Sequence, residues 1–329
     1  MAGRRVLITG VGSYMGTGLA RRLEDHPDFE YVAGLDTRAP REPLHDTELI
    51  EADIRDPVIA TLIPQAGVDT VVHNQIVRQP GPGTSSRTMH DINVIGSLQL
   101  LTACERSPSV KTIVIRGSAG IYGSEPAAPQ FFGEEMTSLF PLRTRFQRDV
   151  AEIENYFSTF ARRHPHLTCT MLRYQPAIGP SLETQMTRYL SAPLVPTYLG
   201  YDPRLQFVHE DDALEALVAA VRHPVRGAVN VAGPGTIGLT RLARMAGRPT
   251  LPLAPPLFAP AAQALQRAGL PALSPDLRRL LRYGRAVDTT RLTREVGFTP
   301  RYGAAAAAQD FVERRHGRRI VPRLAAAVA

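Results

Sequence analysis

The sequence predicts an α/β fold, a doubly wound parallel sheet with a smaller C-terminal lobe. One observation is that short runs of β-branched and apolar residues alternate with amphipathic helical segments over the first half of the chain. This alternation is typical of a parallel sheet with helices on both faces. A second observation is a glycine-rich segment directly between the first predicted strand and the first predicted helix. Glycine at such a junction allows the sharp turn that a strand needs to enter a helix.

The first unit of this pattern contains the strand Arg5–Thr9, the loop Gly10–Gly16 and a second strand, Tyr31–Leu35. Phosphate can reach the free backbone N–H groups at the start of the helix after such a loop, where the helix dipole favours negative charge. Asp36 follows the second strand, at a position where a carboxylate accepts hydrogen bonds from an adenosine ribose. The unit therefore indicates a Rossmann-type dinucleotide site, although Met15 stands where the spacing G-x-G-x-x-G has its third glycine.

The alternation continues along the chain. Further strands are predicted at Glu48–Ala52, Val68–His73, Lys111–Arg116 and Leu167–Leu172, and long helices at Thr88–Arg106 and Phe146–Arg163. After about Pro176 the pattern weakens, and prolines cluster at 252–260. We therefore expect a dinucleotide-binding domain at 1–175, to which strands near 204–232 return, and a smaller lobe that could carry a substrate at 176–203 and 233–329.

Composition excludes several classes of protein. The formal net charge is +7, but the arginines are spread as pairs on helices without interleaved aromatic residues, so we expect no nucleic-acid partner. Cys104 and Cys169 are predicted to be free thiols, and His164-x-His166 has no partners at metal-binding spacing. No apolar run reaches membrane-span length and no signal peptide is visible, so we expect a cytoplasmic protein without a membrane or metal partner.

Several motifs resemble one family. Thr9-Gly10-x-x-Ser13-x-x-Gly16 resembles the T-G-x-x-G-x-x-G loop of the extended short-chain dehydrogenases/reductases, the NAD-dependent epimerase/dehydratase group, with Ser13 in place of the middle glycine. Later segments resemble this family in the right order over nearly the whole chain: Asn93–Gly96, Gly117–Gly123, Leu172–Pro180, Gln206–Asp212, Asn230–Gly233, Val287–Leu292 and Gly297–Pro300.

The resemblance implies a cofactor site and a cofactor. The residues implied to hold the cofactor are Gly10, Gly12, Ser13, Tyr14, Met15, Gly16, Asp36, Thr37, Arg38, Asp53, Ile54, Asn74, Gln75, Asn93, Arg148 and Tyr174. Asp36 would repel a 2′-phosphate, so the expected cofactor is NAD. Arg38, two residues on, keeps NADP possible.

The catalytic pair of the family is absent from its expected place. In this family a tyrosine four residues before a lysine moves the proton, and the lysine lowers the pKa of the tyrosine. Here Thr144 and Arg148 are predicted to occupy those positions, and arginine cannot give up a proton at ordinary pH. The only lysine is Lys111, which opens the strand that Ser118 follows, so the two lie roughly 20 Å apart at ~3.3 Å per residue. The usual tyrosine–lysine mechanism is therefore not expected.

The candidate catalytic residues are Ser118, Thr144, Arg148 and Tyr122, with Tyr174 and His73 as other possible proton carriers. The substrate end also departs from the family. Pro176 and Leu205 stand where an asparagine and an arginine commonly contact a nucleotide-sugar diphosphate. These departures predict a small substrate that is not a nucleotide sugar.

Three functions remain open at this point. The first is an atypical oxidoreductase, epimerase or dehydratase that uses Ser118 with a non-standard acid or base. The second is a dinucleotide-binding protein without redox turnover, acting as a sensor or a partner subunit. The third is a lyase or isomerase that uses the cleft without a cofactor. The helices Thr88–Arg106 and Phe146–Arg163 resemble the pair that forms the family's dimer interface, so a homodimer is expected.

Overall fold

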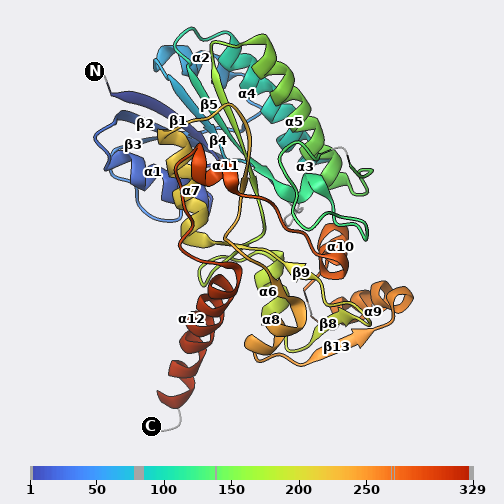
Figure 1. Ribbon diagram of the computed structural model, residues 1–329. Helices are drawn as coiled ribbons and strands as arrows, with labels where there is room; N and C mark the ends of the chain where they lie inside the picture. Colours follow the sequence, from blue (N-terminus) through green and yellow to red (C-terminus); the bar gives the residue numbers. More distant parts are fainter. Residues whose placement is uncertain (1–2, 78–84, 138, 268, 270, 326–329) are drawn as a thin grey trace.

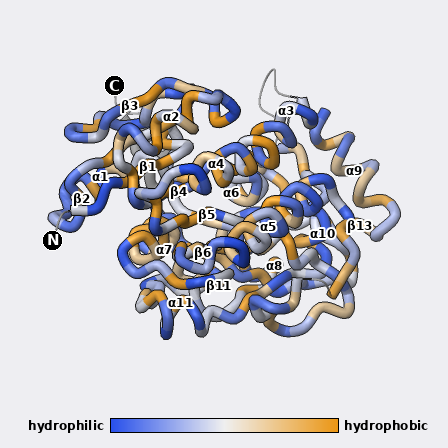
Figure 2. Tube along the Cα trace, turned by 90° about the horizontal axis from the view of Figure 1, so that it is seen from above, coloured by the Kyte–Doolittle hydropathy of each residue, from blue (hydrophilic) through white to orange (hydrophobic). Residues whose placement is uncertain are grey.

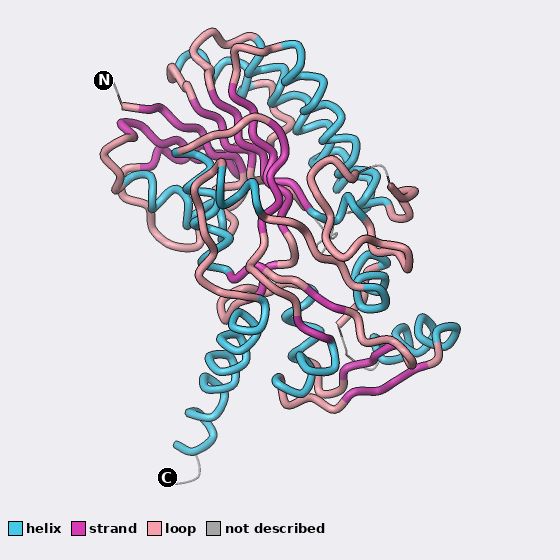
Figure 3. The backbone as a smooth tube through the Cα atoms, in the orientation of Figure 1, coloured by secondary structure: helices cyan, strands magenta, loops and turns pink. Residues whose placement is uncertain are grey.

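The centre of the molecule is one sheet of seven parallel strands. The computed structural model describes residues 3–325 except 78–84, 138, 268 and 270. The strand order is β11-β6-β5-β4-β1-β2-β3. Figures 1 and 3 show this sheet with helices packed around it. The strands are β1 (Arg4–Thr9), β2 (Phe29–Asp36), β3 (Thr47–Glu51), β4 (Thr70–His73), β5 (Thr112–Ser118), β6 (Thr168–Tyr174) and β11 (Gly227–Val231). The predicted doubly wound parallel sheet is confirmed.

Alternate residues of the strands bury opposite faces of the sheet. Val6 and Ile8 pack with one helix layer and Leu7 with the other. The first layer contains α1 (Tyr14–Glu24), α7 (Glu210–Arg222) and α11 (Thr290–Arg294). The second contains α2 (Val58–Gln65), α4 (Gly96–Glu105) and α5 (Arg145–Arg163). Figure 2 shows apolar stretches through the middle of this arrangement.

The chain reverses direction across the sheet at β1, whose two neighbours are β2 and β4. The connections after β1 and β4 therefore leave on opposite sides, and a crevice opens at the carboxyl ends of these two strands. Thr9 and His73 are paired at this edge. The glycine loop follows Thr9, so the topology places it at the crevice.

The predicted helix Thr88–Arg106 is interrupted by a turn of π-helix. The segment consists of α3 (Ser86–His90), the π-turn Asp91–Ile95 and α4. Ser97 donates its hydroxyl to the Asn93 carbonyl within this turn. A Cβ atom on Gly96 would lie 2.6 Å from Ile54 Cγ2, so glycine allows α4 to approach Ile54 closely.

A smaller group of elements lies beyond the carboxyl edge of the sheet (Figure 1). Three two-stranded sheets belong to it: β7 (Ala177–Ile178) with β10 (Val208–His209), β9 (Arg204–Leu205) with β12 (Ile237–Gly238), and β8 (Val195–Tyr198) with β13 (Thr250–Leu253). Its helices are α6 (Gln185–Ser191), α8 (Leu239–Met245), α9 (Pro255–Arg267), α10 (Pro275–Tyr283) and α12 (Ala304–Ala325). A separate apolar core that includes Phe207, Phe258 and Phe311 joins these parts.

The chain passes repeatedly between the sheet and this lobe. Of the stretch near 204–232, α7 and β11 belong to the main sheet, whereas β9 pairs with β12 of the lobe. The late helix α11 packs on β11. The predicted domain boundaries stay a prediction. Among the residues that the structure describes, no helix has both the length and the apolar character needed to cross a membrane.

Candidate functional site

The glycine loop has the geometry of a phosphate-binding turn. Gly10 has φ +74°, a conformation that favours glycine. A Cβ atom on Gly16 would lie 2.1 Å from the carbonyl oxygen of Gly10, so the helix start and the strand end meet only because this residue is glycine. Ser13 caps α1: its hydroxyl accepts the Gly16 N–H at 3.0 Å and donates to the Gly10 carbonyl at 2.8 Å. Ser13 thus has a defined structural role where the family has glycine.

Asp36 lies against this loop at the end of β2. Its carboxylate accepts the backbone N–H groups of Gly12 and Arg38, each at 3.1 Å. Its side chain is buried, whereas Thr37 and Arg38 are exposed. The acid is therefore fixed where β2 ends beside the turn, as a ribose-binding carboxylate must be.

Asn74 and Gln75 bring the end of β4 to the same loop. The Asn74 amide donates to the Ser13 hydroxyl at 2.9 Å. Gln75 packs against Gly10, and its buried Oε1 atom has no hydrogen-bond partner among the described residues. An orphaned acceptor beside a glycine cradle is a feature that a bound nucleotide can satisfy. These residues fit the cofactor role that the sequence predicts.

Three other predicted cofactor residues lie further around the crevice. Asn93 holds the backbone of Val77, with two hydrogen bonds of 2.8 Å through its amide group. Asp53 forms a two-point ion pair with Arg55, which lowers the pKa of Asp53. Ile54 is fully buried beneath Gly96. The role of Asp53 and Ile54 in holding the cofactor, which the resemblance implies, stays a prediction.

Ser118 ends β5 and is followed by a short 3-10 turn, Ala119–Tyr122. Its hydroxyl accepts the Gly120 N–H at 3.1 Å. A Cβ atom on Gly120 would lie 3.1 Å from Ser118 Oγ and 3.2 Å from Cε1 of Phe146. Ser118 and the ring of Phe146, at the start of α5, therefore both lie against Gly120.

The two residues predicted to replace the tyrosine and the lysine are placed differently. Thr144 is the N-cap of α5: its hydroxyl accepts the Gln147 N–H at 3.1 Å and donates to Asp276 at 2.7 Å. Arg148 is exposed one turn later. Phe146 and the buried Val150 instead pack in one cluster with Tyr122. Phe146 is not among the site residues that the sequence predicts, because nothing along the chain indicates which residue at the start of α5 lies against Gly120, next to Ser118.

The two tyrosines near the strand ends are engaged in buried hydrogen bonds. Tyr122 donates to Asn230 at 2.7 Å and accepts from Arg173 at 2.8 Å, and burial raises its pKa to about 12. Tyr174 donates to the Ala213 carbonyl at 3.0 Å, and burial also raises its pKa. These contacts favour a structural role for both hydroxyls, and a role in catalysis or cofactor binding stays a prediction.

His73 forms a buried polar chain between β1 and α4. Its Nδ1 atom lies 2.7 Å from the Thr9 hydroxyl and its Nε2 atom 2.8 Å from the Ser97 hydroxyl. Ser97 donates to the Asn93 carbonyl, so Nε2 must carry the proton and Nδ1 must accept from Thr9. This is a neutral imidazole, and burial lowers its pKa to about 4.

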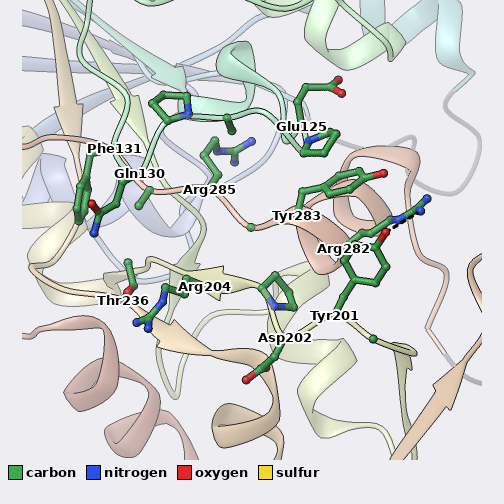
Figure 4. Close-up of a pocket in the computed structure, with 17 residues that line it drawn as sticks. Glu125, Gln130, Phe131, Tyr201, Asp202, Arg204, Thr236, Arg282, Tyr283 and Arg285 are labelled. Atoms are coloured by element: carbon green, nitrogen blue, oxygen red, sulfur yellow. Dashed lines mark hydrogen bonds between the residues drawn. The ribbon is translucent and has the colours of Figure 1, made fainter.

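A cavity of about 470 Å³ is lined by residues of the segments 125–131, 200–204 and 282–286 and by Thr236 (Figure 4). Its wall includes Arg204, Arg282 and Arg285. Arg285 donates to the Gly123 carbonyl at 3.3 Å and to the Gln175 side chain at 3.2 Å, and burial lowers its pKa to about 10. These arginines come from distant parts of the chain, so the sequence did not indicate that they share a cavity. Within the described ranges, no group of three or more histidine, cysteine or acidic side chains is placed to hold a metal ion.

The fold and the loop together define a dinucleotide-binding α/β protein. The family model described as the NAD dependent epimerase/dehydratase family matches residues 6–232, and the chain belongs to this family. Membership confirms both the resemblance and the prediction of NAD as the cofactor. NADP binding stays a prediction.

Relatives and solved structures agree with this assignment. Uncharacterized protein Rv0501 of Mycobacterium tuberculosis is 36% identical over 315 residues, which cover 94% of this chain and 84% of the relative. The UDP-glucose-4-epimerase of Stenotrophomonas maltophila, solved with bound NAD and formylated UDP-arabinopyranose, has a TM-score of 0.74 at 18% identity over 97% of this chain and 99% of its own. The dTDP-glucose 4,6-dehydratase of Bacillus anthracis, in complex with NAD, has a TM-score of 0.70 at 15% identity over 96% of this chain and 97% of its own. At these identities the structures establish the shared fold.

The neutral His73 predicts a pH-dependent stability. The folded-state pKa is about 4, below the ordinary value of 6.5, so the unfolded chain binds the proton more readily between these values. The contribution is intact above pH 6.5 and is lost as the pH falls toward 4, at about 1.4 kcal/mol per pH unit. Urea unfolding of the wild type and of His73→Asn at several pH values measures it. The stability difference between the two proteins should shrink as the pH falls, and a constant difference would contradict the buried neutral state.

Proposed function

We propose that the protein is an NAD-dependent enzyme of the epimerase/dehydratase type, an atypical oxidoreductase on a small substrate that is not a nucleotide sugar. The proposal rests on one juxtaposition. The glycine loop, Asp36 and Asn74 keep the geometry of a cofactor site, while Phe146 shares the surroundings of Gly120 with Ser118. Binding is thus retained where the usual proton carrier is absent.

The side chains at this centre limit the chemistry. Bound NAD supplies a hydride acceptor. The Ser118 hydroxyl, at the carboxyl end of β5, is placed to hydrogen-bond a substrate hydroxyl or carbonyl oxygen. Phe146 has no proton to exchange, and Val150 brings no charge one turn later. The proton must therefore leave through water or through a group of the substrate itself.

The cavity whose wall includes Arg204, Arg282 and Arg285 favours a substrate with an anionic group. Arg285 hydrogen-bonds neutral oxygens, and the charge of Asp276 acts on its pKa without a direct ion pair between the two. Its guanidinium can therefore still donate to a carboxylate or phosphate. Leu205, which stands where the family commonly has an arginine, is fully buried in the apolar core of the lobe. This loss supports the exclusion of a nucleotide-sugar diphosphate.

The second candidate is a dinucleotide-binding protein without turnover. The apolar side chains of Phe146 and Val150, four residues apart on α5, favour it. An apolar pair at the helix start removes acid–base catalysis but leaves the cofactor loop untouched. Such a protein would act as a sensor or as a partner subunit. A cofactor-free lyase or isomerase is less well supported, because the family is NAD-dependent.

Turnover separates the two candidates. The purified protein, supplied with NAD, is incubated with fractionated small metabolites from a bacterial extract, and absorbance at 340 nm reports reduction. The enzyme proposal predicts that one or more fractions drive reduction and that Ser118→Ala lowers the rate roughly 100-fold, as loss of one catalytic hydrogen-bond donor does.

Ser109→Ala is the matched control, since Ser109 bonds the Val68 carbonyl at the other edge of the sheet. Equal rates in wild type and Ser118→Ala would remove Ser118 from the mechanism. Bound NAD without reduction in any fraction would support the second candidate.

We also propose that the protein forms a homodimer through the outer faces of α4 and α5. Ile95, the last residue of the π-turn before α4, and Leu98 of α4 are 41% and 37% exposed, so two large apolar side chains one turn apart face outward. Light scattering after size exclusion tests the proposal. Leu98→Glu should convert a dimer to a monomer, whereas Leu257→Glu, on the exposed surface of the lobe, should not. A monomeric wild type would contradict it.

A further inference from the structure

Arg116 is a charged residue in the interior of β5 that the cofactor residues named above do not include. It stands two positions before Ser118, so both side chains start from the same face of the strand. Its Nη1 atom donates to Asn74 twice, at 3.0 Å to Oδ1 and at 3.3 Å to the backbone oxygen. The guanidinium also lies 6.0 Å from the centroid of the Tyr174 ring. The side chain therefore reaches across the carboxyl ends of three neighbouring strands.

The charge of Arg116 has no counter-ion among the described residues. The neighbouring Arg173 on β6 forms a two-point ion pair with Glu154, at distances of 2.6 to 3.0 Å. By contrast, the contacts of Arg116 are neutral oxygens and a ring. Burial lowers the pKa of Arg116, yet a guanidinium keeps its proton at ordinary pH. A desolvated cation without a partner is costly to the folded protein.

Asn74 connects this cation to the cofactor loop. Its amide donates to Ser13, the N-cap of α1, and its carbonyl oxygen accepts from Arg116. The N-terminus of α1 is itself a region of positive potential. Asn74 thus lies between two positive groups, the N-terminus of α1 and the guanidinium of Arg116. Both groups favour the binding of an anion. The unsatisfied Oε1 atom of Gln75, next along the chain, indicates a ligand at the same edge of the sheet.

We propose that Arg116 is a cofactor-binding residue that supplies positive charge to the anionic dinucleotide. The inference rests on the assignment of NAD to this crevice. The dinucleotide carries two phosphate charges, and the oxidised nicotinamide ring adds one positive charge that the reduced ring lacks. Arg116 therefore strengthens the binding of NADH more than that of NAD⁺ and does nothing for the uncharged adenosine part.

The test compares four ligands on three proteins by isothermal titration calorimetry. The ligands are adenosine, ADP-ribose, NAD⁺ and NADH, and the proteins are wild type, Arg116→Gln and Arg4→Gln. Arg4 is the matched control because burial also lowers its pKa and it bonds the Val221 carbonyl, but it begins β1 at the opposite edge of the sheet. Arg116→Gln should weaken ADP-ribose and NADH roughly 10- to 100-fold, as the loss of charged hydrogen bonds does. It should weaken NAD⁺ less and leave adenosine unchanged, and Arg4→Gln should leave all four unchanged.

Thermal melting separates a ligand-binding role from a structural one. Without ligand, Arg116→Met should melt at the wild-type temperature or above it, since it removes an unpaired buried charge. With NADH, its rise in melting temperature should be smaller than that of the wild type. Equal losses for adenosine and NADH, or a destabilised ligand-free variant with unchanged NADH affinity, would make Arg116 structural and overturn the proposal. A wild type that binds none of the dinucleotides would instead overturn the cofactor assignment, and this inference with it.

Discussion

The hydrogen bonds of the Ser13 hydroxyl determine where the cofactor site can form. This one oxygen accepts the Gly16 N–H, donates to the Gly10 carbonyl and accepts from Asn74. The end of β1, the start of α1 and the segment after β4 are thereby held in one geometry. A glycine at this position, as the family's loop has, would bring no side chain to cap the helix. The serine thus keeps the turn rigid while the remaining N–H groups at the helix start stay free for phosphate.

Cofactor binding and proton transfer depend on different parts of this chain. Binding depends on the N-terminal loop, Asp36 and Asn74, whereas proton transfer in the family depends on the start of α5. In this protein α5 begins with a capping box at Thr144, and Phe146 packs against Gly120. A change at the start of α5 therefore need not alter the cofactor loop, so the proposed atypical enzyme and a binding protein without turnover would share the same architecture.

The sequence predicts the sheet and the loop well because both depend on local patterns. Apolar alternation marked the strands, and the glycines with Asp36 marked the turn, since short-range backbone geometry requires those residue types there. The π-turn at Asp91–Ile95 is not predicted, because the spacing of apolar residues continues through it. Within the structure, the Asn93 carbonyl of this turn accepts the Ser97 hydroxyl of α4.

The arrangement around Ser118 could not be predicted from the sequence, because it depends on packing between segments far apart in the chain. Ser118 and Phe146 both flank Gly120, although they lie in segments that spacing along the chain does not connect. The roles predicted for Thr144 and Arg148 stay predictions. Arg116 likewise reads in the sequence as one more strand residue. Its role depends on Asn74, just after the neighbouring strand β4, and on the lack of a counter-ion among the residues that the structure describes. The cavity lined by Arg204 and Arg285 joins residues far apart in the chain in the same way.

The central claim is that the crevice binds NAD through an intact loop. A thermal-shift titration of the purified protein with NAD, NADH, NADP and NADPH tests it most directly, with Asp36→Ala as the disabled variant and Glu51→Ala, an exposed acid at the end of β3, as the matched control. The melting temperature of the wild type should rise with NAD and NADH. The rise should be smaller in Asp36→Ala and unchanged in Glu51→Ala. No rise with any dinucleotide, in protein shown by mass spectrometry to carry none from purification, would contradict it.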